Sequence, residues 1–233
     1  MQKISTQQEC SDTPLEKQQT LPLQDDETEQ VSPFAAELSI VAGLTMPSIE
    51  DIKKREVFLG PETRKHTLVL DIDNTLVYAR PVESFLMENQ KLACKYDVMV
   101  RPYAIAMLET MSKFYEIVLF TSGSEEYARR MQKYLDPMGT RISKAIGKHY
   151  CIPTKEGFYI KDLRIFADRN IKDIVIVDDK IVSFAFHLQN GIPVLPYTGE
   201  KEDNELRFLI DYLKDLNSVD DIRHMNKERI CIA

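Results

Sequence analysis

The chain has 233 residues and a formal net charge of −7, so its overall charge does not indicate a nucleic-acid-binding protein. Its hydrophobic share of 43% fits one soluble domain of about 150–200 residues with a tail. No apolar run approaches the roughly 18 residues that a membrane span needs, and the N-terminus lacks the pattern of a signal or transit peptide. We therefore expect no direct nucleic-acid partner and no membrane partner. We also expect a monomer, although the sequence carries no pattern that decides the oligomeric state.

The four cysteines are Cys10, Cys94, Cys151 and Cys231, and they lie far apart in the sequence. Their spacing matches no metal-ligand pattern. Free thiols are typical of a reducing compartment, so the sequence predicts a nuclear or cytoplasmic protein without choosing between the two.

The beginning and end of the chain are polar. Residues 1–32 are rich in Gln, Ser, Thr, Asp and Glu and hold few large apolar side chains, a composition that favours disorder. We predict a disordered or poorly ordered tail over residues 1–48, a folded domain over 49–219 and a frayed C-terminal tail over 220–233. A short helix is expected to begin near Ser48.

An apolar run from Thr67 to Leu70 leads directly into Asp71 and Asp73. Such a run predicts a buried parallel strand, and open α/β sheets place their chemistry at the C-terminal ends of such strands. Two crowded carboxylates repel each other unless a cation or a proton is bound. By themselves, these residues fit an Asx turn at a strand end equally well.

Alternation over residues 91–100 indicates short strands, arranged as a small hairpin beside the carboxylates. The triplet that begins at Arg101 is expected to open a helix, with Pro102 in its first turn. We expect the hairpin to act as a lid or a specificity element.

A second apolar strand over residues 116–120 ends in Thr121 and Ser122. Ser124 is placed to cap the following helix, and Tyr127 lies on the apolar face of that helix. Hydroxyl and backbone N–H groups at a strand-to-helix turn suit a phosphate group. An ordinary polar turn explains this stretch alone at least as well.

Residues 137–157, which include Lys148, are predicted to form a loop-rich region. Lys161 then follows three apolar residues, a position from which its side chain would point inward. Lysine usually lies at the surface, so this feature is weak evidence by itself.

A third apolar strand over residues 173–177 delivers Asp178 and Asp179 at its C-terminal end. Together with Asp71 and Asp73, four acidic groups are expected to meet at one edge of a sheet. An oxygen-only set of ligands favours Mg²⁺, so the sequence predicts a magnesium site there. An edge strand over residues 192–196 and an amphipathic helix over 203–216 complete the predicted domain.

Four features of the sequence resemble, in the same order, the four motifs of the haloacid-dehalogenase superfamily. They are the Asp-x-Asp-x-Thr stretch at Asp71, the strand that ends in Thr121, Lys161, and the Asp178–Asp179 pair. The flanking residues resemble, more narrowly, the FCP/SCP-type phosphatases of the RNA polymerase II C-terminal domain. The resemblance covers roughly residues 64–217. It implies an α/β fold: a haloacid-dehalogenase-like Rossmannoid three-layer sandwich with a mostly parallel central sheet and a small β insertion.

The resemblance also implies roles for these residues. Asp71 would be the nucleophile that forms an aspartyl-phosphate, and Asp73 would be the general acid and base, whose backbone carbonyl also binds Mg²⁺. Thr121 and Lys161 would bind the phosphoryl group. The implied metal ligands are Asp71, Asp73, Asp178 and Asp179, and the further candidates for substrate contacts are Ser122, Tyr127 and Lys148.

The implied function is a Mg²⁺-dependent protein serine/threonine phosphatase, with the RNA polymerase II tail or a similar Ser/Pro-rich phosphopeptide as its substrate. Two departures concern that substrate: the stretch from Ser122 to Ser124 stands where the small family members tend to have an apolar residue, and the insertion before Arg101 is short. The alternatives are a non-catalytic phosphopeptide- or presequence-binding module of the same fold and a phosphatase for small metabolites.

Overall fold

The computed structural model describes residues 34–82 and 95–230. Three parts of the sequence-based predictions lie outside the described residues: the disordered segment over residues 1–32, the tip of the hairpin, and the last residues of the C-terminal tail. Cys10, Cys94 and Cys231 lie outside them as well.

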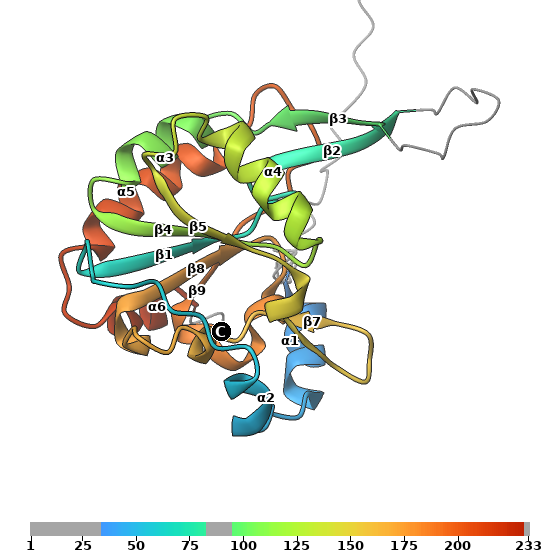
Figure 1. Cartoon of the computed structure of the whole chain (residues 1–233), viewed down its shortest axis with the longest axis vertical. Coiled ribbons are helices and arrows are strands. Elements are labelled where there is room, and N and C mark those ends of the chain that lie inside the picture. Colours follow the sequence, from blue (N-terminus) through green and yellow to red (C-terminus); the bar gives the residue numbers. More distant parts are fainter. Residues whose placement is uncertain (1–33, 83–94, 231–233) are drawn as a thin grey trace, which may run out of the picture. The chain divides into compact units, whose positions relative to one another are not determined.

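A five-stranded parallel sheet forms the centre of the domain (Figure 1). Its strands are β1 (His66–Leu70), β4 (Tyr115–Phe120), β5 (Ile142–Ile146), β8 (Ile174–Asp178) and β9 (Gly191–Pro193). Their order is β5-β4-β1-β8-β9, so β1 is the middle strand and β4 and β8 are its neighbours. This arrangement brings the C-terminal ends of β1, β4 and β8 to one edge, which confirms the predicted α/β class and mostly parallel sheet.

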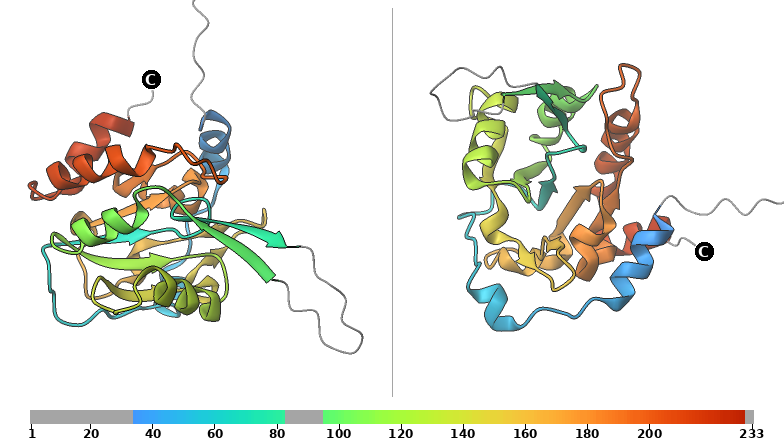
Figure 2. Two further views of the ribbon diagram at one scale, coloured as in Figure 1. Left: turned by 90° about the horizontal axis from the view of Figure 1, so that it is seen from above. Right: turned by 90° about the vertical axis from the view of Figure 1, so that its right-hand side faces the viewer.

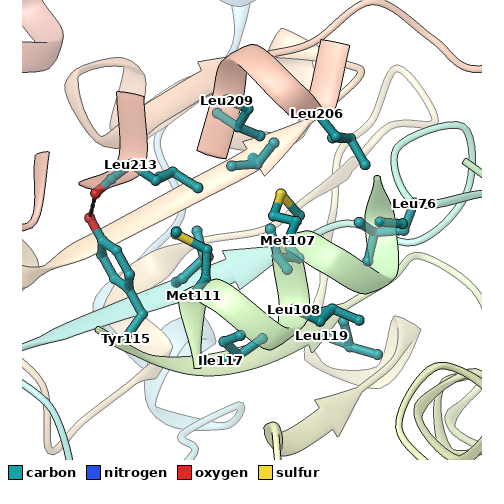
Figure 3. Close-up of a cluster of buried hydrophobic side chains, with 14 of the residues drawn as sticks. Leu76, Met107, Leu108, Met111, Tyr115, Ile117, Leu119, Leu206, Leu209 and Leu213 are labelled. Atoms are coloured by element: carbon teal, nitrogen blue, oxygen red, sulfur yellow. Dashed lines mark hydrogen bonds between the residues drawn. The ribbon is translucent and has the colours of Figure 1, made fainter. Parts of the chain in front are cut away.

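Three helices cover one face of this sheet, and their apolar residues form one of two buried clusters. These helices are α3 (Ala104–Met111), α4 (Glu125–Leu135) and α5 (Glu205–Leu216). Met107 and Met111 of α3 lie between the sheet and the leucines of α5 (Figure 3). The hydroxyl of Tyr115 on β4 donates to the carbonyl of Leu213 on α5 at 2.7 Å, so this buried polar group is satisfied.

The second buried cluster covers the opposite face of the sheet, because side chains alternate along each strand: Leu68 and Leu70 of β1 belong to the first cluster and Val69 to the second. Short helices supply its outer layer: α2 (Ile49–Lys53) and the 3₁₀ helices η1 (Lys148–Tyr150), η2 (Leu163–Ile165), η3 (Ile171–Asp173) and η4 (Ile181–Asn190). A two-stranded ribbon, β6 (Ile152–Pro153) with β7 (Tyr159–Ile160), leads into η2.

Two helices lie in segments that the sequence predicted to be tails, α1 (Ala35–Gly43) and α6 (Ile222–Ile230). α1 lies against η4, where the Glu37 carboxylate accepts a hydrogen bond from the Val182 amide at 3.1 Å. In α6, Ile222 is buried and the Asn226 side chain donates to the Gly191 carbonyl at 3.1 Å. Tertiary packing holds both helices, and their sequences carry little amphipathic pattern that would reveal them.

The predicted hairpin is confirmed as antiparallel β2 (Val77–Val82) and β3 (Lys95–Val100), and it extends away from the sheet (Figure 2). Two predictions of secondary structure were wrong. The region over residues 137–157 contains β5, whose exposed Ser143 and charged neighbours hid a strand at the sheet edge. The helix after Arg101 begins at Ala104, because Tyr103 has a φ of 65° and a left-handed residue cannot continue the α-helix.

Within the described part of the chain, every helix is too short or too polar to cross a bilayer.

Candidate active site

Three buried carboxylates meet where β1 and β8 end. The two strands pair in parallel, and the Asp71 amide continues their ladder by donating to the Val177 carbonyl at 2.9 Å. Asp71 therefore follows β1 beside Asp178, the last residue of β8, and Asp179. One oxygen from each of the three carboxylates lies within 4.8 Å of the others. The structure thus brings together three of the four acidic residues that the sequence selected as metal ligands.

Lys161 lies between two of these carboxylates. Its Nζ donates to Asp178 Oδ2 at 2.6 Å and forms a second hydrogen bond with Asp71 Oδ1. The side chain is only 2% exposed, which confirms the inward orientation predicted from its apolar neighbours. The Lys161 backbone amide donates to the Ser183 carbonyl of η4 at 2.6 Å, so η4 anchors the backbone at this lysine.

Burial and mutual repulsion shift the pKa values of the groups in this cluster. Burial raises the pKa of the Asp71 carboxyl to about 7; Lys161 opposes this rise and Asp178 adds to it. Burial and the Asp178 charge raise the pKa of Asp179 to about 6. Burial alone would lower the pKa of Lys161, but Asp178 and Asp71 raise it above its ordinary value. The lysine is therefore a permanent cation within the cluster.

The donor set fits a divalent cation. Three carboxylates and one ammonium group carry −3 + 1 = −2 when all are ionised, and all four residues are buried. A buried excess of negative charge is costly without a cation. Carboxylate oxygens are the donors that Mg²⁺ prefers, and the cluster contains no sulfur or imidazole donor.

Asp73 belongs to a tight turn beyond Asp71. The Leu76 and Val77 amides both donate to the Ile72 carbonyl at 3.0 Å, and Asn74 adopts a left-handed conformation with a φ of 61°. This turn directs Asp73 towards the end of β4 rather than into the carboxylate cluster. There its Oδ2 accepts from the Thr121 hydroxyl at 3.2 Å, and its Oδ1 accepts from the Tyr127 hydroxyl at 2.5 Å.

The loop after β4 positions Thr121 and the start of α4. The buried Thr121 hydroxyl accepts from the Gly123 amide at 2.9 Å while it contacts Asp73. Ser124 caps α4 by accepting from the Tyr127 amide at 3.1 Å, as the sequence predicted. Ser122 is exposed, and within the described residues its side chain makes no hydrogen bond to the carboxylates.

Lys148 is exposed, and its Nζ lies 4.2 Å from the centre of the Tyr159 ring. The loop that carries it is fixed by Glu125 at the start of α4, whose carboxylate accepts from the Gly147 amide at 3.0 Å and from the His149 amide at 3.3 Å. Sequence alone does not reveal this role of Glu125, because a glutamate in the first turn of a helix is already explained by the helix dipole.

A second missed feature is the buried ion pair of Arg101 with Asp203. Arg101 Nη1 also donates to the Thr75 carbonyl at 3.3 Å, in the turn that carries Asp73. The sequence does hint that Arg101 is buried, because this arginine, immediately before Pro102, stands in an otherwise apolar stretch. Its partner lies 102 residues away, and sequence alone does not reveal that pairing.

Comparison with known families gives one match over most of the chain. Residues 66–223 match the model of the family described as "NLI interacting factor-like phosphatase". The matched region begins at β1 and ends in α6, so it contains every residue of the site described above.

The curated relatives include phosphatases and an import-machinery subunit. The chain is 31% identical over 193 residues to "CTD small phosphatase-like protein 3" of Caenorhabditis elegans, covering 78% of this chain and 67% of that protein. It is 32% identical over 170 residues to the mitochondrial import inner membrane translocase subunit TIM50 of Candida glabrata, covering 72% of this chain and 33% of that protein. The chain thus spans between a third and two thirds of the length of several curated relatives.

The fold also matches a solved structure, described as that of Fcp1, an essential RNA polymerase II CTD phosphatase. The TM-score is 0.56 at 18% identity, and the match covers 66% of this chain and 62% of that one. At this identity the likeness shows the fold, which agrees with the parallel sheet described above.

Proposed function

The chain belongs to the NLI interacting factor-like phosphatase family, and on that premise we propose that it is a Mg²⁺-dependent protein serine/threonine phosphatase acting through an aspartyl-phosphate. The observation that carries the proposal is the position of Lys161 between Asp71 and Asp178, with Asp179 beside them. A buried lysine that neutralises two carboxylates next to a third is suited to binding a phosphoryl group together with a cation.

Asp71 is the proposed nucleophile. One of its oxygens accepts from Lys161, which leaves the other for in-line attack on phosphorus. Lys161 also offers its charge to the phosphoryl oxygens as the aspartyl-phosphate forms. The Thr121 hydroxyl, at the end of the neighbouring strand β4, donates to a phosphoryl oxygen.

Asp73 is the proposed proton carrier. It protonates the departing serine or threonine oxygen in the first step and takes a proton from the attacking water in the second. Its place outside the carboxylate cluster supports this role, because it is half-buried and bonded to hydroxyl groups rather than to Lys161.

Asp71, Asp178, Asp179 and the backbone carbonyl of Asp73 would hold Mg²⁺. The ion supplies neutralisation of phosphoryl charge and orientation of the phosphoryl group when it is bound.

A phosphorylated protein segment is the proposed substrate, with the Ser/Pro-rich tail of RNA polymerase II as one candidate; the name of the Caenorhabditis elegans relative supports this class.

We propose a nuclear or cytoplasmic site of action and a monomer. The proposed catalytic domain corresponds to the predicted range 49–219. α6, whose first turn packs into the core, extends the folded part beyond it.

The match to the TIM50 subunit favours one alternative, a binding module of the same fold without catalysis. The structure instead favours an enzyme, because one buried cluster holds Asp71, Lys161, Asp178 and Asp179, and Asp73 and Thr121 are bonded to each other at the ends of the neighbouring strands. A phosphatase for small metabolites is the third candidate.

A phosphopeptide array, assayed in parallel with the wild type and Asp71→Asn, separates these functions. The expected result is Mg²⁺-dependent phosphate release by the wild type and none by the variant, with p-nitrophenyl phosphate as a second substrate. Phosphate release that persists in Asp71→Asn or in excess EDTA would refute the mechanism. Peptide binding without release by either protein would establish the binding module.

A further inference from the structure

We propose that Tyr127 is a positioning residue for Asp73: its hydroxyl fixes one carboxylate oxygen so that the other exchanges the proton with the leaving group. This inference rests on the proposed function of Asp73. It gives Tyr127 a part in proton transfer, in place of the substrate-contacting aromatic side chain that the sequence suggested.

Each oxygen of the Asp73 carboxylate accepts a hydrogen bond from a different hydroxyl group. The Tyr127 hydroxyl donates to Oδ1 at 2.5 Å, and the Thr121 hydroxyl donates to Oδ2 at 3.2 Å. Each hydroxyl therefore restrains a different oxygen of the carboxylate, and together the two bonds set the orientation of the carboxylate plane.

The Tyr127 ring is itself seated by the loop after β4. Its amide donates to the Ser124 cap at 3.1 Å, which fixes the first turn of α4. The ring lies against Gly123: a β-carbon at that position would come within 2.7 Å of Tyr127 Cδ1. Such a distance is shorter than van der Waals contact allows, so the absence of a side chain at Gly123 permits the ring to lie where it reaches Asp73.

The two restraints behave differently when a substrate binds. Thr121 has one hydroxyl hydrogen, and donating it to a phosphoryl oxygen removes the bond to Asp73 Oδ2. Tyr127 continues to hold Oδ1. Oδ2 is then the oxygen whose proton moves to the leaving oxygen, while the bond from that oxygen to phosphorus breaks and the bond from Asp71 to phosphorus forms. In the second step the same oxygen takes a proton from water, while the water oxygen bonds to phosphorus and the bond from Asp71 to phosphorus breaks.

The test compares two aryl phosphates of nearly equal size. Phenyl phosphate releases a more basic oxygen than p-nitrophenyl phosphate, so its hydrolysis depends more on the acid. We expect Tyr127→Phe to lower kcat/KM for phenyl phosphate about tenfold, with a much smaller loss for p-nitrophenyl phosphate, because kcat/KM reports formation of the aspartyl-phosphate and the second step is common to both substrates. The matched control is Tyr134→Phe, a tyrosine of the same helix that is 51% exposed, which should leave both rates unchanged.

Gly123→Ala provides a second variant, because its methyl group must displace the Tyr127 ring, whereas the Thr121 hydroxyl, 3.3 Å away, needs to shift by only a few tenths of an ångström. It should produce the same selective loss on phenyl phosphate, with melting curves showing that both variants fold. Equal losses of kcat/KM on the two substrates would overturn the positioning role and restore a substrate-contacting one. If the wild type hydrolyses neither aryl phosphate nor phosphopeptides, the proposed function itself is wrong.

Discussion

Arg101 and Asp203 form a two-pronged ion pair in the interior of the domain, with Nε 2.9 Å from Oδ1 and Nη2 2.7 Å from Oδ2. Because Arg101 also donates to the Thr75 carbonyl, the pair fastens the turn that carries Asp73 to the loop before α5. The Arg101 guanidinium lies 5.5 Å from the centre of the Tyr197 ring as well, so several elements converge on one cation.

Arg101→Ala should destabilise the protein by about 3–5 kcal/mol, because it leaves the Asp203 carboxylate without its buried partner. Urea unfolding measures this loss. Arg80→Ala is the matched control: Arg80 pairs with Asp97 at 3.3 Å on the exposed hairpin, and its loss should cost less than about 1 kcal/mol. Equal costs for the two variants would contradict the structural role of the buried pair.

Magnesium should raise the melting temperature more at pH 8 than at pH 5. The pKa values of Asp71 and Asp179 are raised to about 7 and about 6, so at pH 5 both carboxyls hold protons that a metal must displace. Without metal, the stability that these raised values contribute is fully present below the unfolded value of 3.8 and is lost as the pH rises through 6 to 7.

Calorimetric scans with Mg²⁺ and with EDTA at both pH values measure this difference. At a concentration of 100 times Kd, the expected stabilisation at pH 8 is about 2.7 kcal/mol. Asp179→Asn should reduce the shift, because it removes one ligand. An identical shift at both pH values would show that these carboxyls do not bind the ion.

Asp162→Asn should weaken the fold at neutral pH by about 2–3 kcal/mol. Burial by itself would raise the pKa of Asp162, but hydrogen bonds from Arg164 and His187, the latter at 2.8 Å, hold it well below its usual range. The stability that this carboxylate contributes is therefore present above its unfolded value of 3.8 and is lost as the pH falls below it.

Melting temperatures between pH 2.5 and 7 should show the deficit of Asp162→Asn shrinking below pH 4. Asp211→Asn serves as the control, since the Asp211 side chain is exposed on α5 and its loss should change little at any pH. A deficit that is constant with pH would mean that Asp162 contributes through packing rather than through its charge.

Gly147→Ala should cost about 1–3 kcal/mol, because its methyl group would lie 2.8 Å from the Glu125 amide and from the Gly123 carbonyl. Both contacts are backbone atoms that cannot move aside easily. Activity should fall in parallel, since the Lys148 amide donates to that same Gly123 carbonyl at 2.7 Å beside Thr121. Gly43→Ala is the control, with nothing within 4 Å of the added methyl group.

The sequence predicted the strands that carry Asp71, Thr121 and Asp178 because each is an apolar run that ends in polar residues, a local pattern. It also predicted the inward side chain of Lys161 from its three apolar neighbours. These features depend on residues adjacent in the chain, and the structure confirms where they lie.

Other features depend on partners distant in the sequence. α1 lies in a weakly patterned stretch and is held against η4 through Glu37, 145 residues before Val182. The Tyr127 hydroxyl reaches Asp73 across 54 residues, and Lys148 contacts Tyr159. A hydrogen bond of this kind leaves no periodicity in the sequence, so its partners emerge only from the folded chain.

The order of strands in the sheet has a kinetic consequence. The middle strand β1 pairs with β4 and β8, whose paired residues follow those of β1 by 49 and 107 positions, and Lys161 and Asp71 are 90 residues apart. Closing such long loops precedes any gain from the contacts they allow, which slows folding. During synthesis Asp71 leaves the ribosome long before Lys161, which neutralises it, so the charge balance of the site can form only after most of the domain has been made.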